Sequence, residues 1–227
     1  VSPYYDFDAI SKSVEAGGHR AVIGGMWDEI GRLQMDFLIA YGLQRQSTLL
    51  DIGCGSLRLG VRAVEYLEAG RYWGTDINES LLDSGYQKEI VPANLAAKLP
   101  RQQLVVDGDF SFSGLPHQFD FAIAQSLFTH LPLNHLRLCL HRLGRHLSGD
   151  CRFFLTAFIV KDAQACEPVQ HEPGGVTTYP CRDPYHHTVE DLRYAARGLP
   201  WSIEDVIDWN HPRAQRMAIL KFQPTRP

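Results

Sequence analysis

The sequence has no strong excess of charge of either sign. It carries 22 Lys and Arg residues against 26 Asp and Glu, a formal net charge of −4, and no run of five or more basic residues. Proteins that bind nucleic acid or an anionic membrane surface usually present a basic face to it. We therefore expect no nucleic-acid partner and no membrane partner.

Long apolar runs and a cysteine framework are also missing. Stretches such as RFFLTAFIV at residues 152–160 are far shorter than the ~20 residues that span a bilayer. The first residues, VSPYYDFDAI, lack the basic start and apolar centre of a secretory signal. The five cysteines are scattered and form no C-x-x-C pair, which argues against a disulfide framework and against a zinc site. These absences predict a cytoplasmic protein that holds no metal.

What the sequence does contain is a change of pattern at residue 47. Before it, apolar residues recur on one helical face over residues 27–41, and Gly42 stands where a C-terminal helix cap belongs. After it, short apolar runs alternate with helical stretches, a pattern typical of a parallel sheet covered by helices on both faces. We predict an α/β fold with a doubly wound sheet and an N-terminal helical extension. The predicted strands are residues 47–53, 72–77, 103–107, 119–126, 152–160, 201–207 and 215–222.

We predict one domain, because no linker or internal repeat divides the chain. Residues 161–188 are rich in Pro, Gly and His and are expected to form a long functional loop. Thr188 and Asp191 make a capping box that begins a short helix. The expected parts are an N-terminal extension or lid (1–46), a core (47–160), the loop (161–188), and a C-terminal helix with two strands (189–227).

The stretch LLDIGCGSLRLG, residues 49–60, ends an apolar strand on an acid and continues with very small side chains. Glycines at the carboxyl end of a strand let backbone N–H groups approach a ligand. The chain contains no Gly-Lys pair, which excludes a phosphate-binding P-loop, and Arg58 stands where a dinucleotide fingerprint has its third glycine. A second acid, Asp76, ends the next strand 21 residues beyond Gly55, a spacing at which an acid reaches ribose hydroxyls. These features favour a positively charged nucleoside without phosphate.

At these residues the sequence resembles the class I S-adenosylmethionine-dependent methyltransferases. LLDIGCG and GTDINESLL are similar to the first two motifs of that family, and VVDGDF and FDFAIAQSLFTHL are similar to the third and fourth. The resemblance covers about residues 47–160, with the four motifs in order. It implies a Rossmann-like methyltransferase fold, with a mostly parallel seven-stranded sheet whose last strand is antiparallel. It also implies S-adenosylmethionine as the cofactor and S-adenosylhomocysteine as its product.

For the first two motifs, the resemblance implies contacts with the sugar and the amino-acid end of the cofactor. Gly53 and Gly55 would line the amino-acid end, and Asp51 would stand close to the methionyl ammonium. Asp76 would accept hydrogen bonds from both ribose hydroxyls. Each of the two acids also has a purely structural reading, as a cap of the turn that follows it. Leu57 departs from the family pattern, which has a third small residue at this point.

For the other motifs, the resemblance implies contacts with the adenine and the reacting centre. Ile77 would pack on the adenine, Asp109 would accept from its amino group, and Phe110 would donate a backbone N–H or stack nearby. Asp109 is also suited to a turn without any ligand, because Asp-Gly-Asp is good turn chemistry. Gln125 and Ser126, at the end of the fourth strand, would face the methionine.

Two groups of residues are candidates for the acceptor side of the reaction. His130, just beyond the fourth strand, is the candidate general base, with a structural role at the start of the next helix as the alternative. Tyr185, His186 and His187 on the long loop, together with Trp209, are the candidate acceptor-binding residues. Adjacent residues of an extended segment point to opposite sides, so at most one of the two loop histidines is expected to face the site.

We therefore predict methyl transfer to a hydroxyl or amine of a small-molecule metabolite. The fourth strand ends in AQSLF and lacks the Asn/Asp-Pro-Pro-Tyr of enzymes that methylate base nitrogens. Protein or peptide methylation stays open, because a long loop can also form a groove. Two other classes are a module that binds S-adenosylmethionine without catalysis and a nicotinamide-dependent oxidoreductase.

Overall fold

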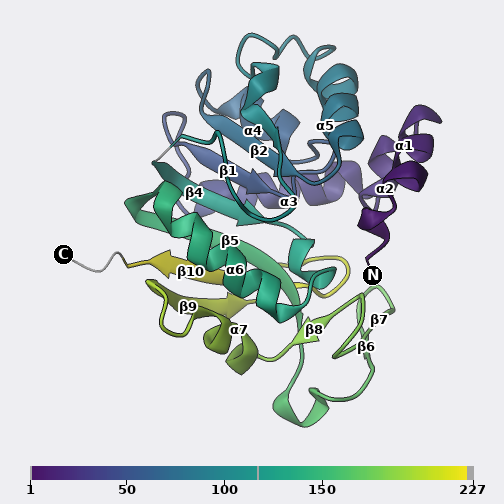
Figure 1. Cartoon of the computed structure of the whole chain (residues 1–227), viewed down its shortest axis with the longest axis vertical. Coiled ribbons are helices and arrows are strands. Elements are labelled where there is room, and N and C mark those ends of the chain that lie inside the picture. The colour runs from purple at the N-terminus through teal and green to yellow at the C-terminus, as the bar shows by residue number, and fades with distance from the viewer. Residues whose placement is uncertain (1, 117, 224–227) are drawn as a thin grey trace.

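The computed structural model describes residues 2–116 and 118–223 of the 227-residue chain. One large sheet forms its centre (Figure 1). Its seven main strands are β1 (Leu49–Ile52), β2 (Tyr72–Asp76), β3 (Leu104–Val106), β4 (Phe119–Ala124), β5 (Leu147–Ile159), β9 (Trp201–Ile207) and β10 (Arg216–Phe222). They lie in the order β3-β2-β1-β4-β5-β10-β9, with β1 to β5 parallel and β10 antiparallel to both of its neighbours. The predicted doubly wound sheet and its antiparallel last strand are confirmed.

Helices cover both faces of this sheet. They are α3 (Trp27–Ala40), α4 (Gly60–Tyr66), α5 (Glu79–Gly85), α6 (Leu133–Leu143) and α7 (Val189–Ala196), with single turns at η2 (Tyr86–Ile90), η3 (Arg101–Gln103), η4 (Leu127–Thr129) and η5 (Gly144–His146). Helices α3 and α4 bury their apolar residues on one face of the sheet, while α6 and α7 bury theirs on the other. In Figure 1, α6 and α7 lie in front of the sheet.

The strands supply both cores because successive side chains point to opposite faces. Phe153 and Leu155 of β5 pack with α6 and α7, while Phe154 between them packs with α3. These three side chains have no exposed surface. Full burial of one such side chain contributes about 1.5–3 kcal/mol. The sheet is thereby fixed between its two helical layers.

The N-terminal segment forms short helices, as predicted for residues 1–46. They are η1 (Pro3–Tyr5), α1 (Phe7–Glu15) and α2 (His19–Val22). Asp6 caps α1 by accepting a hydrogen bond from the Ala9 N–H at 3.0 Å. Ile10 and Val14 of α1 pack against Leu81 of α5, which places the segment beside the carboxyl ends of the central strands (Figure 1).

Residues 161–188 contain more regular structure than the expected loop. They hold η6 (Asp162–Gln164), a hairpin of β6 (Val169–His171) and β7 (Val176–Thr178), and β8 (His186–His187), which pairs with β5. The Thr178 hydroxyl lies 2.8 Å from both the His171 Nε2 and the His186 Nδ1, joining the hairpin to β8. The strands are too short to show an alternating pattern, so the sequence did not reveal them. The capping box of Thr188 and Asp191 that follows is present.

No helix within the described part of the chain is long and apolar enough to cross a bilayer.

Candidate active site

A cavity opens at the carboxyl ends of β1, β2 and β4, where the strand order reverses between β1 and β4. Ligands of doubly wound sheets bind at this kind of crevice. Nine of the residues singled out in the sequence line it: Asp51, Gly53, Gly55, Asp76, Ile77, Phe110, Gln125, Ser126 and His130. The topology thus brings together residues that are up to 79 positions apart.

The glycine turn brings bare backbone to the cavity wall. Gly53 and Gly55 have φ of +72° and +54°, which glycine adopts without steric cost. A Cβ on Gly55 would lie 2.7 Å from the Ile23 side chain, and one on Gly53 would lie 3.1 Å from Leu127. Leu57 keeps the left-handed geometry with φ of +70° although it is not glycine, and its side chain is fully buried. The departure from the family motif therefore changes the residue but retains a left-handed bend.

Asp76 points its carboxylate at the glycine turn. One oxygen accepts the Gly55 N–H at 2.9 Å, and the other accepts the Asn78 N–H at 2.9 Å. Each carboxylate oxygen has a second lone pair, so both remain able to accept from a ligand. Burial raises the pKa of Asp76, while the backbone N–H groups of Asn78 and Gly55 lower it. The geometry fits the expected acceptor of ribose hydroxyls.

Asp51 is the other buried carboxylate of the cavity. It is 3% exposed and accepts a hydrogen bond from the Tyr72 hydroxyl at 2.8 Å. Burial raises its pKa to about 7, against the lowering effects of the Tyr72 hydrogen bond and of Arg58. A buried carboxylate with this pKa is stabilised in its charged form by a cationic ligand.

The structure places Asp107, in place of Asp109, at the cavity. The Asp109 side chain is 68% exposed and pairs with Arg142 at 3.1 Å on the outside of the molecule. Asp107 and Phe110 line the cavity, and the Asp107 carboxylate accepts the Phe112 N–H at 2.7 Å. This placement corrects the expectation that Asp109 accepts a hydrogen bond from the amino group of the adenine. The Asp-Gly-Asp sequence offers two acids, and only the path of the chain after β3 decides which one faces inward.

A hydrogen-bonded cluster closes the cavity at the end of β4. The Gln125 Nε2 donates to the Ser126 hydroxyl at 2.6 Å, and that hydroxyl donates to the Gln215 Oε1 at 2.9 Å. The Thr156 hydroxyl also donates to the Gln215 Oε1, at 2.7 Å. His211 lies 3.3 Å from the Gln125 Nε2, and burial lowers the pKa of His211 to about 3. These residues hold the Gln125 amide in a fixed position.

His130 lines the cavity and is oriented by a carboxylate from the long loop. Its Nδ1 lies 2.8 Å from the Asp183 Oδ1, and its ring meets the Tyr4 ring edge-on with centroids 4.9 Å apart. The Tyr185 N–H donates to the Thr129 carbonyl at 2.7 Å and so anchors the loop beside this turn. The pairing of Nδ1 with Asp183 leaves Nε2 as the ring nitrogen that can accept a proton.

The four candidate acceptor-binding residues lie outside the lining of this cavity. The His186 side chain is buried, and its Nδ1 lies 2.8 Å from the Thr178 hydroxyl. The neighbouring His187 is also buried, and this burial lowers its pKa. Trp209 is buried against α3 and donates its Nε1–H to the Gln215 carbonyl at 2.9 Å. Tyr185 contributes its backbone to the loop anchor. Neither loop histidine faces the cavity.

Among residues 2–116 and 118–223, no group of three or more His, Cys, Asp or Glu side chains is arranged to hold a metal ion.

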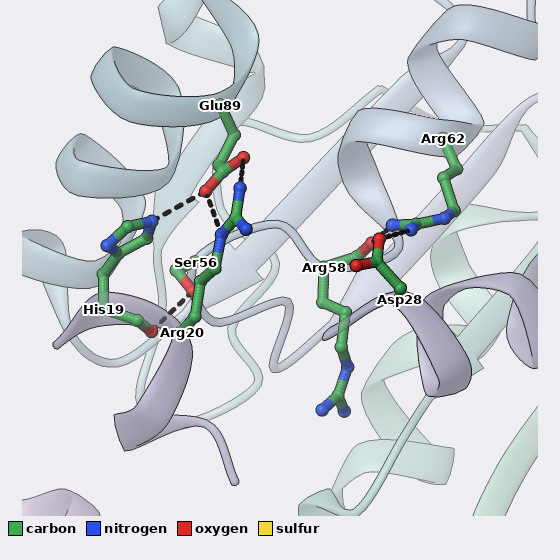
Figure 2. Close-up of polar contacts among 7 residues, drawn as sticks. All are labelled: His19, Arg20, Asp28, Ser56, Arg58, Arg62 and Glu89. Atoms are coloured by element: carbon green, nitrogen blue, oxygen red, sulfur yellow. Dashed lines mark hydrogen bonds and ion pairs between the residues drawn. The ribbon is translucent and has the colours of Figure 1, made fainter. Parts of the chain in front are cut away.

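The sequence predicted an N-terminal extension or lid over residues 1–46 but did not show which of its residues reach the cavity. Tyr4 and Ile23 line the cavity, so the segment covers it, whereas Trp27 packs against His19 and Arg20. Figure 2 shows the polar ties that hold this cover to the core. Glu89 pairs with His19 and Arg20 at 2.7 Å, and the Ser56 hydroxyl donates to the His19 carbonyl at 2.8 Å. These contacts join residues about 37 to 70 positions apart, and no local pattern signals them.

Comparison with known proteins agrees with this geometry. Residues 50–153 match the family model of a methyltransferase domain. The solved structure of magnesium protoporphyrin IX methyltransferase from Synechocystis, with bound S-adenosylmethionine, is 17% identical, covering 86% of this chain and 81% of that one at a TM-score of 0.60. An S-adenosylmethionine-dependent methyltransferase from Clostridium acetobutylicum is 12% identical, covering 97% and 99% at a TM-score of 0.64. A TehB-like S-adenosylmethionine-dependent methyltransferase from Corynebacterium glutamicum is 17% identical, covering 96% and 100% at a TM-score of 0.61.

Proposed function

We propose that this chain, which carries a methyltransferase domain in the class I S-adenosylmethionine-dependent fold, transfers the methyl group of S-adenosylmethionine to a small-molecule acceptor. The resemblance drawn from the four motifs is confirmed by the family model and the shared fold. The observation that carries the proposal is the meeting of the glycine turn with Asp51 and Asp76 in one cavity. A nucleoside with a positively charged end fits this combination.

The residues present fit such a cofactor. Asp76 would accept hydrogen bonds from the ribose hydroxyls, and Ile77 and Phe110 would pack on the adenine. We assign to Asp107 the carboxylate that accepts a hydrogen bond from the adenine. Asp51 would face the methionyl ammonium. When bound, the cofactor supplies an electrophilic methyl carbon, which is transferred by in-line displacement. The work of the protein is alignment of the acceptor with that carbon and removal of the acceptor proton.

His130 is the proposed general base for an acceptor hydroxyl or ammonium. Asp183 accepts the Nδ1–H at 2.8 Å, which fixes the tautomer with a basic Nε2 and stabilises the imidazolium after proton transfer. The ring of His130 lies on the wall of the cavity, where an acceptor would enter. The Asp183 carboxylate is therefore a positioning group, whereas His130 would contact the acceptor.

A small-molecule acceptor is supported by several features together. The chain has a slight negative net charge, and its cavity is covered by the N-terminal segment. Among proteins with this fold, one acts on magnesium protoporphyrin IX and another is the pyocyanin biosynthetic protein. A cytoplasmic setting remains the prediction from the composition.

Calorimetric titration tests the cofactor assignment. We expect S-adenosylhomocysteine to bind wild type with micromolar or tighter affinity, about −8 kcal/mol, and NAD not to bind. Asp76→Ala should weaken binding by about 2 to 4 kcal/mol, because it removes a charged acceptor of two hydrogen bonds. Asp109→Ala is the matched control, since its side chain lies outside the cavity. Equal affinity of wild type and Asp76→Ala would show that the assignment of Asp76 is wrong.

Transfer itself is tested with methyl-labelled S-adenosylmethionine and a metabolite extract. Wild type should label a small molecule, and His130→Asn should lower the labelling rate about 100-fold or more while leaving cofactor affinity unchanged. A protein that binds cofactor but labels nothing would instead be a non-catalytic module. Loss of cofactor affinity in His130→Asn would indicate a structural role for the histidine.

A further inference from the structure

Arg58 is a buried cation that has no carboxylate partner among the residues that the structure describes. The residue is 7% exposed and lines the cavity. Its Nη1 donates to the carbonyls of Ile23 and Gly25 at 3.3 and 2.9 Å, and its Nη2 donates to the Gln125 Oε1 at 3.5 Å. Its Nε, also buried, has no hydrogen-bond partner. All of its partners are neutral.

The neighbouring arginines make the contrast clear. Arg20 pairs with Glu89 at 2.7 Å, and Arg62 pairs with Asp28 at 2.6 Å. In Figure 2 the guanidinium of Arg58 points away from both of these pairs. Within the described part of the chain, no carboxylate oxygen lies within ion-pair distance of Arg58, although it is more deeply buried than Arg20. Burial of an unpaired charge is costly, and it lowers the pKa of Arg58 to about 10.

The chemistry of a guanidinium indicates what would complete this site. Its planar fork matches a carboxylate and binds it through two parallel hydrogen bonds. Asp51 lines the same cavity and interacts electrostatically with Arg58. The Asp51 carboxylate and the Arg58 guanidinium together give this part of the cavity a buried anion and a buried cation, which is complementary to a zwitterion, that is, to an α-amino acid group.

We propose that Arg58 is a carboxylate-binding residue of the cavity and that it takes the carboxylate of the methionyl group of the cofactor, whose ammonium faces Asp51. The inference rests on the proposed function and deepens it. An acceptor molecule is the other source of a carboxylate, and the experiment below distinguishes the two. Arg58 also ties the N-terminal cover through Ile23 and Gly25, so its test must separate ligand binding from anchoring.

The test compares S-adenosylmethionine with decarboxylated S-adenosylmethionine, which differs only in lacking the carboxylate. Wild type should bind the first about 10- to 100-fold more tightly, the range expected for a charged hydrogen-bonded pair. In Arg58→Gln this preference should fall to threefold or less, because affinity for S-adenosylmethionine drops by a larger factor than affinity for the decarboxylated form. Arg58→Lys, which keeps the charge but loses the fork, should give an intermediate ratio.

Arg213→Gln is the matched control. The Arg213 Nη2 donates to the Gly24 carbonyl at 2.8 Å and so anchors the same cover without lining the cavity. Its loss should change the affinity for both nucleosides by the same factor and leave their ratio unchanged. Should Arg58→Gln behave in the same way, Arg58 only anchors the cover, and the proposal is wrong.

The remaining outcomes are also decisive. Equal affinity of wild type for the two nucleosides would overturn the assignment of Arg58 and leave the carboxylate to an acceptor. Failure of wild type to bind either nucleoside would overturn the proposed function itself. If Arg58→Gln does not fold, as judged by circular dichroism, the wild-type ratio together with the Arg58→Lys ratio still decides the proposal.

Discussion

Asp51 and Asp76 end neighbouring parallel strands, yet their surroundings give them different properties. Asp76 is held by two backbone N–H groups, whose hydrogen bonds oppose the rise that burial causes in its pKa. Asp51 has one neutral hydroxyl partner, and its pKa is about 7. The charge of Asp51 therefore changes near neutral pH, and a cationic ligand would shift that change to lower pH.

The first prediction concerns this titration. The groups that act on Asp51 are the Tyr72 hydroxyl, Arg58 and Asp76. In the free protein the ionised fraction of Asp51 rises from about one tenth at pH 6 to about one half at pH 7, and only the ionised form pairs with an ammonium. Calorimetry with S-adenosylhomocysteine should show an affinity about fivefold higher at pH 7 than at pH 6.

The control for this prediction is Asp51→Asn, which keeps an acceptor for the Tyr72 hydroxyl. Its affinity should be lower and should not change between pH 6 and pH 7. A wild-type affinity independent of pH in this range would contradict the placement of the ammonium at Asp51.

In the absence of ligand the same raised pKa acts against the stability of the folded protein. The folded protein holds a proton that the unfolded chain releases, so the contribution of Asp51 to stability declines as pH rises from about 4 to about 7.

At the scale of elements, the carboxyl end of the sheet is completed by segments outside it. Helix α2 and the residues after it cover the cavity, and the turn at η2 holds α2 through Glu89. Burial raises the pKa of Glu89, but hydrogen bonds from Arg20 and His19 outweigh this and lower it overall. A buried carboxylate with two such donors is a strong tie between α2 and η2.

The second prediction removes this tie. Glu89→Gln should lower the free energy of local opening of residues 16–26 by about 1–2 kcal/mol, because it removes charge-assisted hydrogen bonds to Arg20 and His19. Hydrogen exchange measured by mass spectrometry should then be about tenfold faster in this segment and unchanged in β4 and β5. The control is Glu190→Gln on α7, which removes an exposed pair with Arg193 and should have almost no effect. Faster exchange throughout the molecule would mean that Glu89 supports the whole fold.

At the scale of the whole molecule, one cavity joins the N-terminal cover, four strand ends and the loop that carries Asp183. A ligand in that position contacts segments from most of the chain. Because it binds only the folded state, it stabilises that state by an amount set by its concentration relative to Kd.

The third prediction follows from this linkage. At 100 times its Kd, S-adenosylhomocysteine should add about 2.7 kcal/mol to the free energy of unfolding. For a domain of this size that corresponds to a rise in Tm of about 5–10 °C in a thermal melt. The rise should fall to about 3 °C or less in Asp76→Ala at the same ligand concentration, and NAD should produce none. An equal rise with NAD would favour the oxidoreductase alternative over the methyltransferase.

Local chemistry explains why much of the fold and part of the site were predictable. Gly53, Gly55 and Asp76 can be recognised from residue type and spacing alone, because the glycine turn and the acid that ends the next strand lie within one short stretch of sequence. Asp107 was missed because two acids flank Gly108, and sequence does not show which of them faces the cavity. Asp183 was only one of several polar loop residues until the loop was seen to fold back onto His130.

The sequence by itself determined the order of the seven main strands and the helices between them, the glycine turn and the two strand-end acids, since each depends on side-chain periodicity or backbone freedom over a few residues. Only the tertiary structure decided which residues of the N-terminal segment reach the cavity, that Asp183 orients His130, and that no carboxylate among the described residues pairs with the buried Arg58. These arrangements depend on contacts between residues 33 to 67 positions apart. Such contacts are set by how the layers pack, and no local pattern in the chain records them.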